Sequence, residues 1–146
     1  MTDVKLRYAI TYLEMTASPA TSVGDPPVAD AELRLVQDIS VPFYRQLYRE
    51  VGEDWLWWER LVLSDEELDT LLRDPGVEVH VLYVGDRPAG FAELDRRNPG
   101  EVEVRYLGLI PHFIGRGLGG WMLETVVRIA WRGAPHRGGR PSRGRT

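Results

Sequence analysis

The sequence predicts an α/β domain of the α+β type, in which flanking helices cover a central, mostly antiparallel mixed sheet. Three stretches with strand character, 77–84, 87–95 and 101–110, follow one another with only short segments between them. Turn signals such as Gly85-Asp86 separate these stretches, which is typical of an antiparallel meander. Helical patterns lie before and after the meander, so helices and strands are segregated rather than strictly alternating.

The first part of the chain predicts two further strands. Residues 4–13 alternate apolar and polar side chains, which is the period of a half-buried strand. The segment 15–30 is rich in Ser, Thr, Ala and Pro and predicts a loop. Residues 31–38 predict a second strand, with Leu33 and Leu35 on one face.

Two helices are predicted between these strands and the meander. Ser40 is a candidate N-cap and Pro42 fits the first turn of a helix that ends at Gly52. Ser64 and Glu67 have the spacing of a capping box, in which each side chain accepts a hydrogen bond from the backbone of the other residue. A second, short helix is therefore expected to start after Ser64.

A third helix is expected over residues 117–131, where apolar side chains cover most of the circumference. Beyond it, the last fifteen residues carry five Arg, no acidic residue and a single aliphatic side chain, that of Ala134. Such a segment buries too little apolar surface to offset its ordering entropy. We therefore expect one domain over residues 1–131, followed by a basic, disordered tail over residues 132–146.

Composition argues against several classes of function. A length of 146 residues suits one domain, and 43% hydrophobic with 27% charged residues is ordinary for a protein without a membrane span. The N-terminus does not resemble a signal peptide, so a cytoplasmic location is expected. There is no cysteine and the three His are far apart in sequence, so no metal is expected. The net charge is −4, and five of the 18 basic residues lie in the last fifteen positions, so the rest of the chain is more acidic than the net charge indicates. An acidic domain argues against nucleic-acid binding and suits a cationic substrate.

The most informative segment is 107–120, where a strand passes through a glycine-rich loop into a helix. Glycines at 115, 117, 119 and 120 remove Cβ atoms where a backbone must approach a ligand closely. Free N–H groups at the helix start, together with the helix dipole, form an anion site. A diphosphate is the natural ligand of such a site.

This arrangement resembles the acetyl-CoA signature of the GNAT (GCN5-related) N-acetyltransferase superfamily. The signature has a hydrophobic residue and Pro at the strand end, then Gln/Arg-x-x-Gly-x-Gly/Ala at the start of the helix. Leu109, Pro111, Gly117 and Gly119 match it. Ile114 departs from it, because Gln or Arg is usual at that position.

The resemblance covers roughly residues 31–131. It implies the acyl-CoA N-acyltransferase (GNAT) fold and transfer of an acetyl group from acetyl-CoA to a primary amine of a small molecule or peptide. It also implies that the backbone of Leu109 and Ile110 pairs with the pantetheine arm. The pyrophosphate would then lie against the loop and the helix start, which comprise Gly115, Arg116, Gly117, Leu118, Gly119 and Gly120.

Amine acetylation needs a base that removes a proton from the attacking amine. The resemblance implies that a Glu on the strand 101–110 serves as this base, and Glu103 is the candidate. An ordinary cross-strand pair with an arginine explains Glu103 equally well. His112, in the following loop, is a weaker candidate. Three Trp within residues 55–58 fall where the superfamily shapes its acceptor pocket, although core packing explains them more simply than substrate binding.

The resembled fold continues after its third helix with further strands and often a Tyr that protonates the leaving thiolate. No Tyr follows Tyr106 here. We therefore expect a C-terminally incomplete fold with an exposed sheet edge, which would favour a homodimer. A catalytically impaired acyl-CoA-binding domain and an interaction module remain alternatives. A dinucleotide-binding fold is disfavoured because no acidic residue follows Glu124.

Overall fold

The computed structural model describes residues 3–8, 11–15 and 24–132. The predicted tail from residue 133 onward lies outside the described residues, as do residues 16–23 of the predicted loop. The described elements are, in order, β1 (Asp3–Tyr8), β2 (Thr11–Met15), β3 (Ala31–Leu35), α1 (Val41–Gly52), the 3₁₀ turn η1 (Glu53–Trp55), α2 (Asp65–Arg73), β4 (Val77–Val84), β5 (Arg87–Asp95), β6 (Glu101–Leu109), the 3₁₀ turn η2 (Pro111–Phe113) and α3 (Leu118–Arg132).

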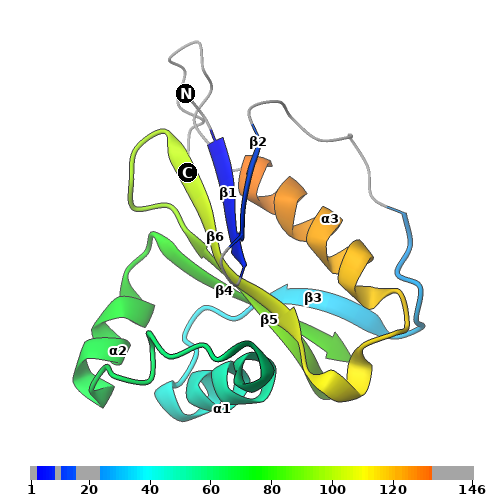
Figure 1. Ribbon diagram of the computed structural model, residues 1–146, viewed down its shortest axis with the longest axis horizontal. Helices are drawn as coiled ribbons and strands as arrows, with labels where there is room; N and C mark the ends of the chain where they lie inside the picture. The colour runs from blue at the N-terminus through cyan, green and yellow to red at the C-terminus, as the bar shows by residue number, and fades with distance from the viewer. Residues whose placement is uncertain (1–2, 9–10, 16–23, 133–146) are drawn as a thin grey trace.

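The described strands form one six-stranded sheet in the order β2-β1-β6-β5-β4-β3 (Figure 1). Neighbouring strands are antiparallel, except that β1 and β6 run parallel. The predicted mostly antiparallel mixed sheet is confirmed. The meander of β4, β5 and β6 is confirmed as well, because the strand bounds agree with the sequence pattern to within one residue.

Helices cover both faces of this sheet, α3 on one side and α1 with α2 on the other (Figure 1). On the α3 side, Met122 and Val126 of the helix are buried in one core cluster with Val102 and Val104 of β6. The core on the opposite face contains residues of α1, α2 and the central strands, among them Tyr44, Leu47, Tyr48, Val51, Leu68, Val81 and Phe91. The sheet therefore separates two hydrophobic cores.

The two predicted N-caps begin α1 and α2. The Phe43 amide donates to the Ser40 hydroxyl at 3.2 Å. At the start of α2, the Glu67 amide donates to the Ser64 hydroxyl at 3.0 Å and the Ser64 amide donates to Glu67 at 2.8 Å. These bonds satisfy amides that a helix start leaves without internal partners.

The prediction of one strand over residues 4–13 is wrong. The structure has two antiparallel strands there, in which Leu6 pairs with Leu13 and Tyr8 with Thr11. Apolar and polar residues keep alternating through the boundary between the strands, and no Gly, Pro, Asn or Asp interrupts them. The usual turn signal is therefore missing from the sequence.

The strand predicted over residues 31–38 is shorter than expected and ends at Leu35. The Val36 amide still donates to the Val79 carbonyl at 3.0 Å, so the backbone follows β4 for one further residue. The chain then turns toward Ser40, which begins α1. Because the N-cap residue lies only five positions after the strand, the turn must occupy residues that the alternation assigned to β3.

One edge of β6 is partly covered by another strand of the sheet. Strand β1 pairs with Glu101 to Val104 of β6 and covers the first part of this edge. Within the described residues, no strand pairs with residues 105–109 on the same side. The uncovered part begins where the β5–β6 pairing shifts register beside Glu93 and Leu94.

Candidate functional site

A groove of about 400 Å³ lies between the end of β6 and the first turns of α3. Its lining is mostly apolar and consists of Trp55, Leu107, Gly108, Leu109, Ile114, Gly119, Gly120, Met122 and Leu123. Ligand sites typically combine such apolar walls with a few directed polar groups. Here the polar groups come from the backbone of β6 and from the start of α3.

The β6 backbone directs hydrogen-bonding groups toward the uncovered edge of the sheet. The pairing of β5 with β6 is regular from Tyr106 to Leu109. Just beyond, the Ile110 amide donates to the Ala89 carbonyl at 2.7 Å, so Ile110 faces the β5 side. Consecutive residues of an antiparallel ladder point their N–H and C=O groups to opposite sides. Leu107 and Leu109 therefore direct theirs away from β5, where an extended ligand with amide groups could pair as an added strand does.

Ile110 was expected to take part in the same pairing, but its backbone groups are used within the chain. In addition to the amide bond to Ala89, the Ile110 carbonyl accepts the Phe113 amide at 2.8 Å. This second bond closes η2. The backbone groups of Leu109 lie on the uncovered side of β6, and so do those of Leu107, which the sequence analysis does not single out.

The start of α3 supplies a second set of polar groups. The first helical backbone bond runs from the Trp121 amide to the Gly117 carbonyl, so the amides of Leu118, Gly119 and Gly120 precede the helical ladder. Gly115 and Gly117 have φ angles of +94° and +79°, which only glycine adopts without strain. Together with the helix dipole, this backbone can bind an anion.

Two arginines lie beside this loop. The Arg116 guanidinium carbon is 5.6 Å from the centroid of the Phe113 ring, and that of Arg87 is 5.4 Å from the same ring. Arg116 was expected near the anion site from its place in the motif. Arg87 begins β5 and was not, because only the fold brings the two arginines to one ring.

A buried polar cluster lies on the other face of the sheet. The Glu93 carboxylate is 1% exposed, accepts a hydrogen bond from the Tyr44 hydroxyl and is 2.6 Å from an Arg60 guanidinium nitrogen. Burial lowers the pKa of Arg60, but the charge of Glu93, its hydrogen bond to Arg60 and the neighbouring tyrosines Tyr44 and Tyr106 together raise the pKa above its usual value. Burial and the charge of Glu93 both raise the pKa of Tyr44. The cluster therefore holds one ion pair, with a protonated phenol beside it.

A second carboxylate contacts a β6 side chain on this face. The Tyr106 hydroxyl donates to Glu59 at 2.6 Å, and the Tyr48 hydroxyl lies 3.4 Å from the Tyr106 hydroxyl. Burial raises the pKa of Tyr106, and the bond to Glu59 raises it further. Tyr106 therefore stays protonated as a donor. Glu59 is half-buried and lies in the connection between α1 and α2.

The predicted base and the alternative histidine both lie outside the lining of the groove. Glu103 is half-buried on β6, opposite Asp95 of β5, and its carboxylate is 3.7 Å from the Arg105 guanidinium. The expected arginine contact thus exists, although it lies along one strand instead of across two. His112 is exposed in η2, with its ring edge-on to Phe113.

The three tryptophans between α1 and α2 divide into two groups. The Trp57 ring packs against Tyr48, Phe91 and Tyr106, with centroid distances of 5.6, 6.1 and 4.8 Å. Core packing therefore explains Trp57. Trp55 and Trp58 are exposed, and Trp55 also lines the groove.

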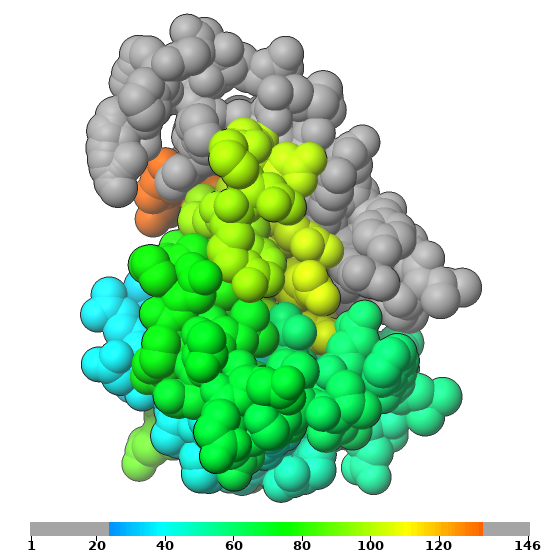
Figure 2. All heavy atoms as spheres, turned by 90° about the vertical axis from the view of Figure 1, so that its left-hand side faces the viewer, coloured from blue at the N-terminus to red at the C-terminus, as the bar shows by residue number. Residues whose placement is uncertain are grey.

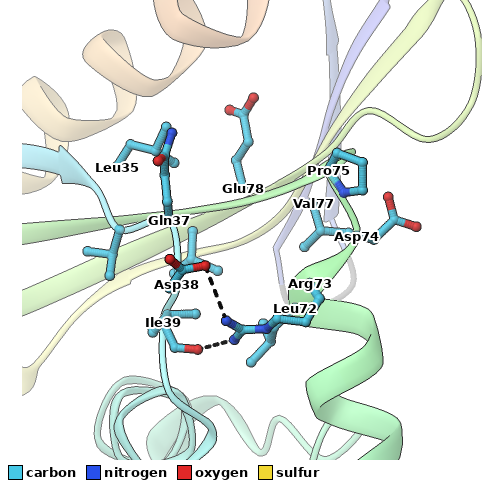
Figure 3. A pocket seen from close by; sticks show the side chains of 12 residues that line it. Leu35, Gln37, Asp38, Ile39, Leu72, Arg73, Asp74, Pro75, Val77 and Glu78 are labelled. Carbon is cyan, nitrogen blue, oxygen red and sulfur yellow. Dashed lines mark hydrogen bonds and ion pairs between the residues drawn. The ribbon is translucent and has the colours of Figure 1, made fainter.

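Another cavity, of about 310 Å³, lies at the β3 end of the sheet (Figure 3). Arg73 pairs there with Asp38 and also donates to the Ile39 carbonyl. Glu78 accepts from Arg96 at 2.9 Å and lies 3.0 Å from His80. These charged side chains already pair with one another, so they are less suited to bind a ligand than the backbone groups of the groove.

A sequence model described as "Acetyltransferase (GNAT) family" matches residues 34–136, which is more than half of the chain. The chain belongs to the GNAT acetyltransferase family. The matched segment contains α1 to α3, and hence the whole lining of the groove.

A solved structure supports the same fold for this GNAT family member. It is an acetyl transferase from Salmonella typhimurium, described as modifying the N-terminal serine of 50S ribosomal subunit protein L7/L12. The alignment has 20% sequence identity and a TM-score of 0.50, and it covers 79% of this chain and 69% of the other. No curated protein matches the sequence significantly.

In the ranges 3–8, 11–15 and 24–132, no group of three or more His, Asp or Glu side chains is placed to hold a metal ion. No helix in the same ranges is long and apolar enough to cross a bilayer.

Proposed function

We propose that this protein transfers an acetyl group from acetyl-CoA to a primary amine of a small molecule or peptide. One observation carries the proposal: the uncovered backbone edge of β6 meets the glycine-rich start of α3 around a single apolar groove. Acetyl-CoA has matching parts. Its pantetheine arm carries two amides, and its pyrophosphate is an anion.

Each part of the groove has a role in this proposal. The edge groups of Leu107 and Leu109 pair with the pantetheine amides, as an added strand would. The segment Gly115–Gly120 receives the pyrophosphate on its free amides, and Arg116 adds a positive charge. Ile110 shapes η2 through its own backbone bonds and does not pair with the ligand. The side chains of Met122 and Leu123 contribute to the apolar wall of the groove.

The chemistry then requires a neutral amine at the thioester. The amine nitrogen attacks the carbonyl carbon, a C–N bond forms, the C–S bond breaks, and coenzyme A leaves as a thiolate. Glu103 takes the amine proton, directly or through water, and solvent protonates the thiolate. Glu59 is a second candidate for the base, since it shares a hydrogen bond with Tyr106 on the adjoining part of β6.

A peptide is included among the acceptors for two reasons. Outside the arginine-rich last fifteen residues, acidic residues outnumber basic ones, and this negative charge suits a cationic amine. The structural neighbour from Salmonella is described as acting on a protein N-terminus, which makes a peptide amine a chemically reasonable acceptor to test.

A thiol-release assay with acetyl-CoA tests the proposal directly. The acceptor panel should contain small aliphatic amines, aromatic amines, and peptides with a free N-terminus or a lysine. Release above the rate without acceptor, with the acetylated amine found by mass spectrometry, supports the transferase. Acetyl-CoA binding in calorimetry without transfer to any acceptor would favour an acyl-CoA-binding domain instead. Absence of binding would contradict both.

A further inference from the structure

Arg105 on β6 is a half-buried cation that the fold leaves poorly paired. Its side chain is 22% exposed, and its buried Nε atom has no hydrogen-bond partner among the described residues. Its ion pair with Glu103 has an N–O distance of 3.7 Å, which exceeds the length of a hydrogen bond. A buried donor without a partner costs stability, so a native structure that keeps one calls for a functional explanation.

Two other arginines with little exposed surface are bound more fully. Arg60 lies 2.6 Å from the Glu93 carboxylate. Arg96 donates to Glu78 at 2.9 Å and to two carbonyls at the end of α3 at 2.9 and 3.0 Å. The fold uses these two guanidinium groups for its own packing, whereas that of Arg105 remains available to a ligand.

The carboxylate of Asp95 on β5 does not supply the missing partner. Asp95 lies opposite Glu103 in the sheet, but its carboxylate is bound by Arg97. The Arg97 guanidinium donates to both carboxylate oxygens, at 3.0 and 2.8 Å, and the Arg97 amide donates to the same group at 3.0 Å. Asp95 therefore has little capacity left to bind Arg105.

Arg105 lies where the edge of β6 becomes uncovered. Strand β1 pairs with β6 as far as Val104, and no described strand pairs with residues 105–109 on that side. On the other side, the register with β5 skips Arg105 between Val104 and Tyr106, so Arg105 is the extra residue of a β-bulge. Bulges are common next to active sites, because they redirect a side chain.

The reactive end of the cofactor is expected at the same place. The proposed binding mode puts the pyrophosphate at Gly115–Gly120 and the pantetheine amides at Leu109 and Leu107, so the thioester lies beyond Leu107, toward Arg105. The two residues between them span about 7 Å of strand. In Figure 2, the yellow-green and yellow part of the chain, which includes β6, reaches the surface above the teal and green segments around α1 and α2.

We propose that Arg105 is a catalytic residue whose guanidinium stabilises the thiolate of coenzyme A as it leaves. This inference rests on the proposed acetyl transfer. The amine nitrogen attacks the thioester carbonyl, Glu103 takes the amine proton, and the C–S bond breaks with its electron pair remaining on sulfur. Negative charge thereby moves from the Glu103 carboxylate to the sulfur. A fixed cation beside both positions offsets the charge before and after the transfer, which lowers the barrier.

The test titrates the thiol of bound coenzyme A, which requires binding but no turnover. The ultraviolet absorbance of the thiolate is recorded against pH with the full-length protein in excess, and the absorbance of the protein alone is subtracted. We expect the pKa of the bound thiol to be lower than that of free coenzyme A by about 1, as beside a cation. Arg105→Gln should abolish this difference, and Arg105→Lys should retain part of it. Arg34→Gln is the matched control, because it removes the same charge from β3, at the far edge of the sheet.

Steady-state kinetics and thermal unfolding separate this role from a structural one. Arg105→Gln should lower kcat about a hundredfold with little change in KM for acetyl-CoA. The melting temperature should stay close to that of the parent, because the ion pair with Glu103 is long and the Nε atom has no described partner. A large loss of stability with an unchanged thiol pKa would show that Arg105 only supports the fold, and would overturn the proposal.

The remaining outcomes distinguish this inference from the proposed function. A lowered thiol pKa that depends on Arg105, in a protein that transfers no acetyl group, would keep the thiolate site and reject the transferase. Acetyl transfer with an equal thiol pKa in the parent and in Arg105→Gln would overturn the role of Arg105 alone. A weaker KM for the acceptor with unchanged kcat would assign Arg105 to acceptor binding and would also overturn it. Absence of coenzyme A binding would overturn both.

Discussion

At the residue scale, the glycines of the groove and of the adjoining loop differ in the strain that an added side chain would cause. A Cβ on Gly119 would have only the Leu109 Cδ1 atom near it, at 3.8 Å, so the fold has room for it. A Cβ on Gly117 would be 3.5 Å from Pro27, and the backbone there has a φ angle of +79°. Substitution of Gly117 therefore strains the backbone, whereas Gly119 tests the ligand site alone.

Gly119→Val should lower the affinity for acetyl-CoA at least tenfold, because the added side chain lies in the groove beside the amides proposed to hold the pyrophosphate. The melting temperature should stay within a few degrees of the parent. Isothermal titration calorimetry and thermal unfolding measure the two effects. Gly24→Val serves as the control, since Gly24 has nothing within 4 Å of its Cβ position and does not line the groove. Equal losses of affinity in both variants would remove the assignment.

Glu103→Gln should lower the turnover of acetyl transfer about a hundredfold, as expected for a lost general base, with little change in acetyl-CoA affinity. Glu59→Gln is the companion variant, because the Glu59 carboxylate accepts a hydrogen bond from Tyr106 of β6. Steady-state kinetics at neutral pH distinguish the two. A rate near the parental one for Glu103→Gln, with a large loss for Glu59→Gln, would transfer the role of base to Glu59 and make Glu103 structural.

The candidate residues that the sequence predicts have a local signal, whereas contacts that only the fold brings about could not be predicted. The glycines and Arg116 lie in one short motif, so their spacing was informative. In the sequence, Glu93 lies in an ordinary strand pattern and Arg60 follows three tryptophans, and neither pattern indicates an ion pair. Their pairing spans 33 residues of sequence. Only the packing of the α1–α2 connection against β5 reveals it.

At the element scale, the Arg60–Glu93 pair holds the connection between α1 and α2, residues 53–63, against the central strand β5. The two side chains are 9% and 1% exposed, so water does not compensate either charge if its partner is lost. The same cluster includes the Tyr44 hydroxyl of α1, which donates to Glu93. The ion pair and this hydrogen bond together connect α1, the segment 53–63 and β5.

Arg60→Met should lower the free energy of unfolding by about 3–5 kcal/mol, because it leaves a buried and unpaired Glu93 charge. Arg60→Met combined with Glu93→Leu should recover a large part of that loss. Urea unfolding of the parent, both single variants and the double variant gives the coupling energy as a double-mutant cycle. Additive losses, without recovery in the double variant, would show that the two side chains act independently.

The elements with explicit end signals were predictable, and the others were not. Helices α1 and α2 begin at Ser40 and Ser64, because these hydroxyls satisfy amides that the helix leaves open. The boundary between β1 and β2 has no such signal. An alternating pattern fixes which residues share a face of a strand, but it does not mark where a strand reverses unless a turn residue interrupts it.

At the scale of the whole molecule, the sheet joins the two ends of the described chain, because β1 pairs with β6, the last strand in sequence. Strand β1 runs parallel to β6 and covers Glu101 to Val104. Among the strands that the structure describes, none covers the edge beyond these residues, beside the groove. Sequence could not predict this, because pairing between strands so distant in the chain leaves no local pattern. The proposed pantetheine site depends on this partial coverage.

Deleting residues 1–15 should expose the β6 edge from Glu101 to Val104 and promote association between molecules. Sedimentation velocity should show oligomers that grow with concentration. Deleting residues 133–146 is the matched control, and we expect it to shift the melting temperature by less than a few degrees, since these residues contain one aliphatic side chain. An N-terminal deletion that remains monomeric and as stable as the parent would show that β1 does not protect this edge.

Amide hydrogen exchange with and without acetyl-CoA tests the central claim, that the open edge of β6 receives the cofactor. At saturating acetyl-CoA, exchange at Leu107 and Leu109 should slow about tenfold or more, because their edge-facing amides gain partners. The Ile110 amide is the internal reference and should change little, since it already donates to Ala89. If acetyl-CoA binds in calorimetry and exchange at both leucines stays unchanged, the cofactor does not pair with this edge and the assignment of the groove is wrong.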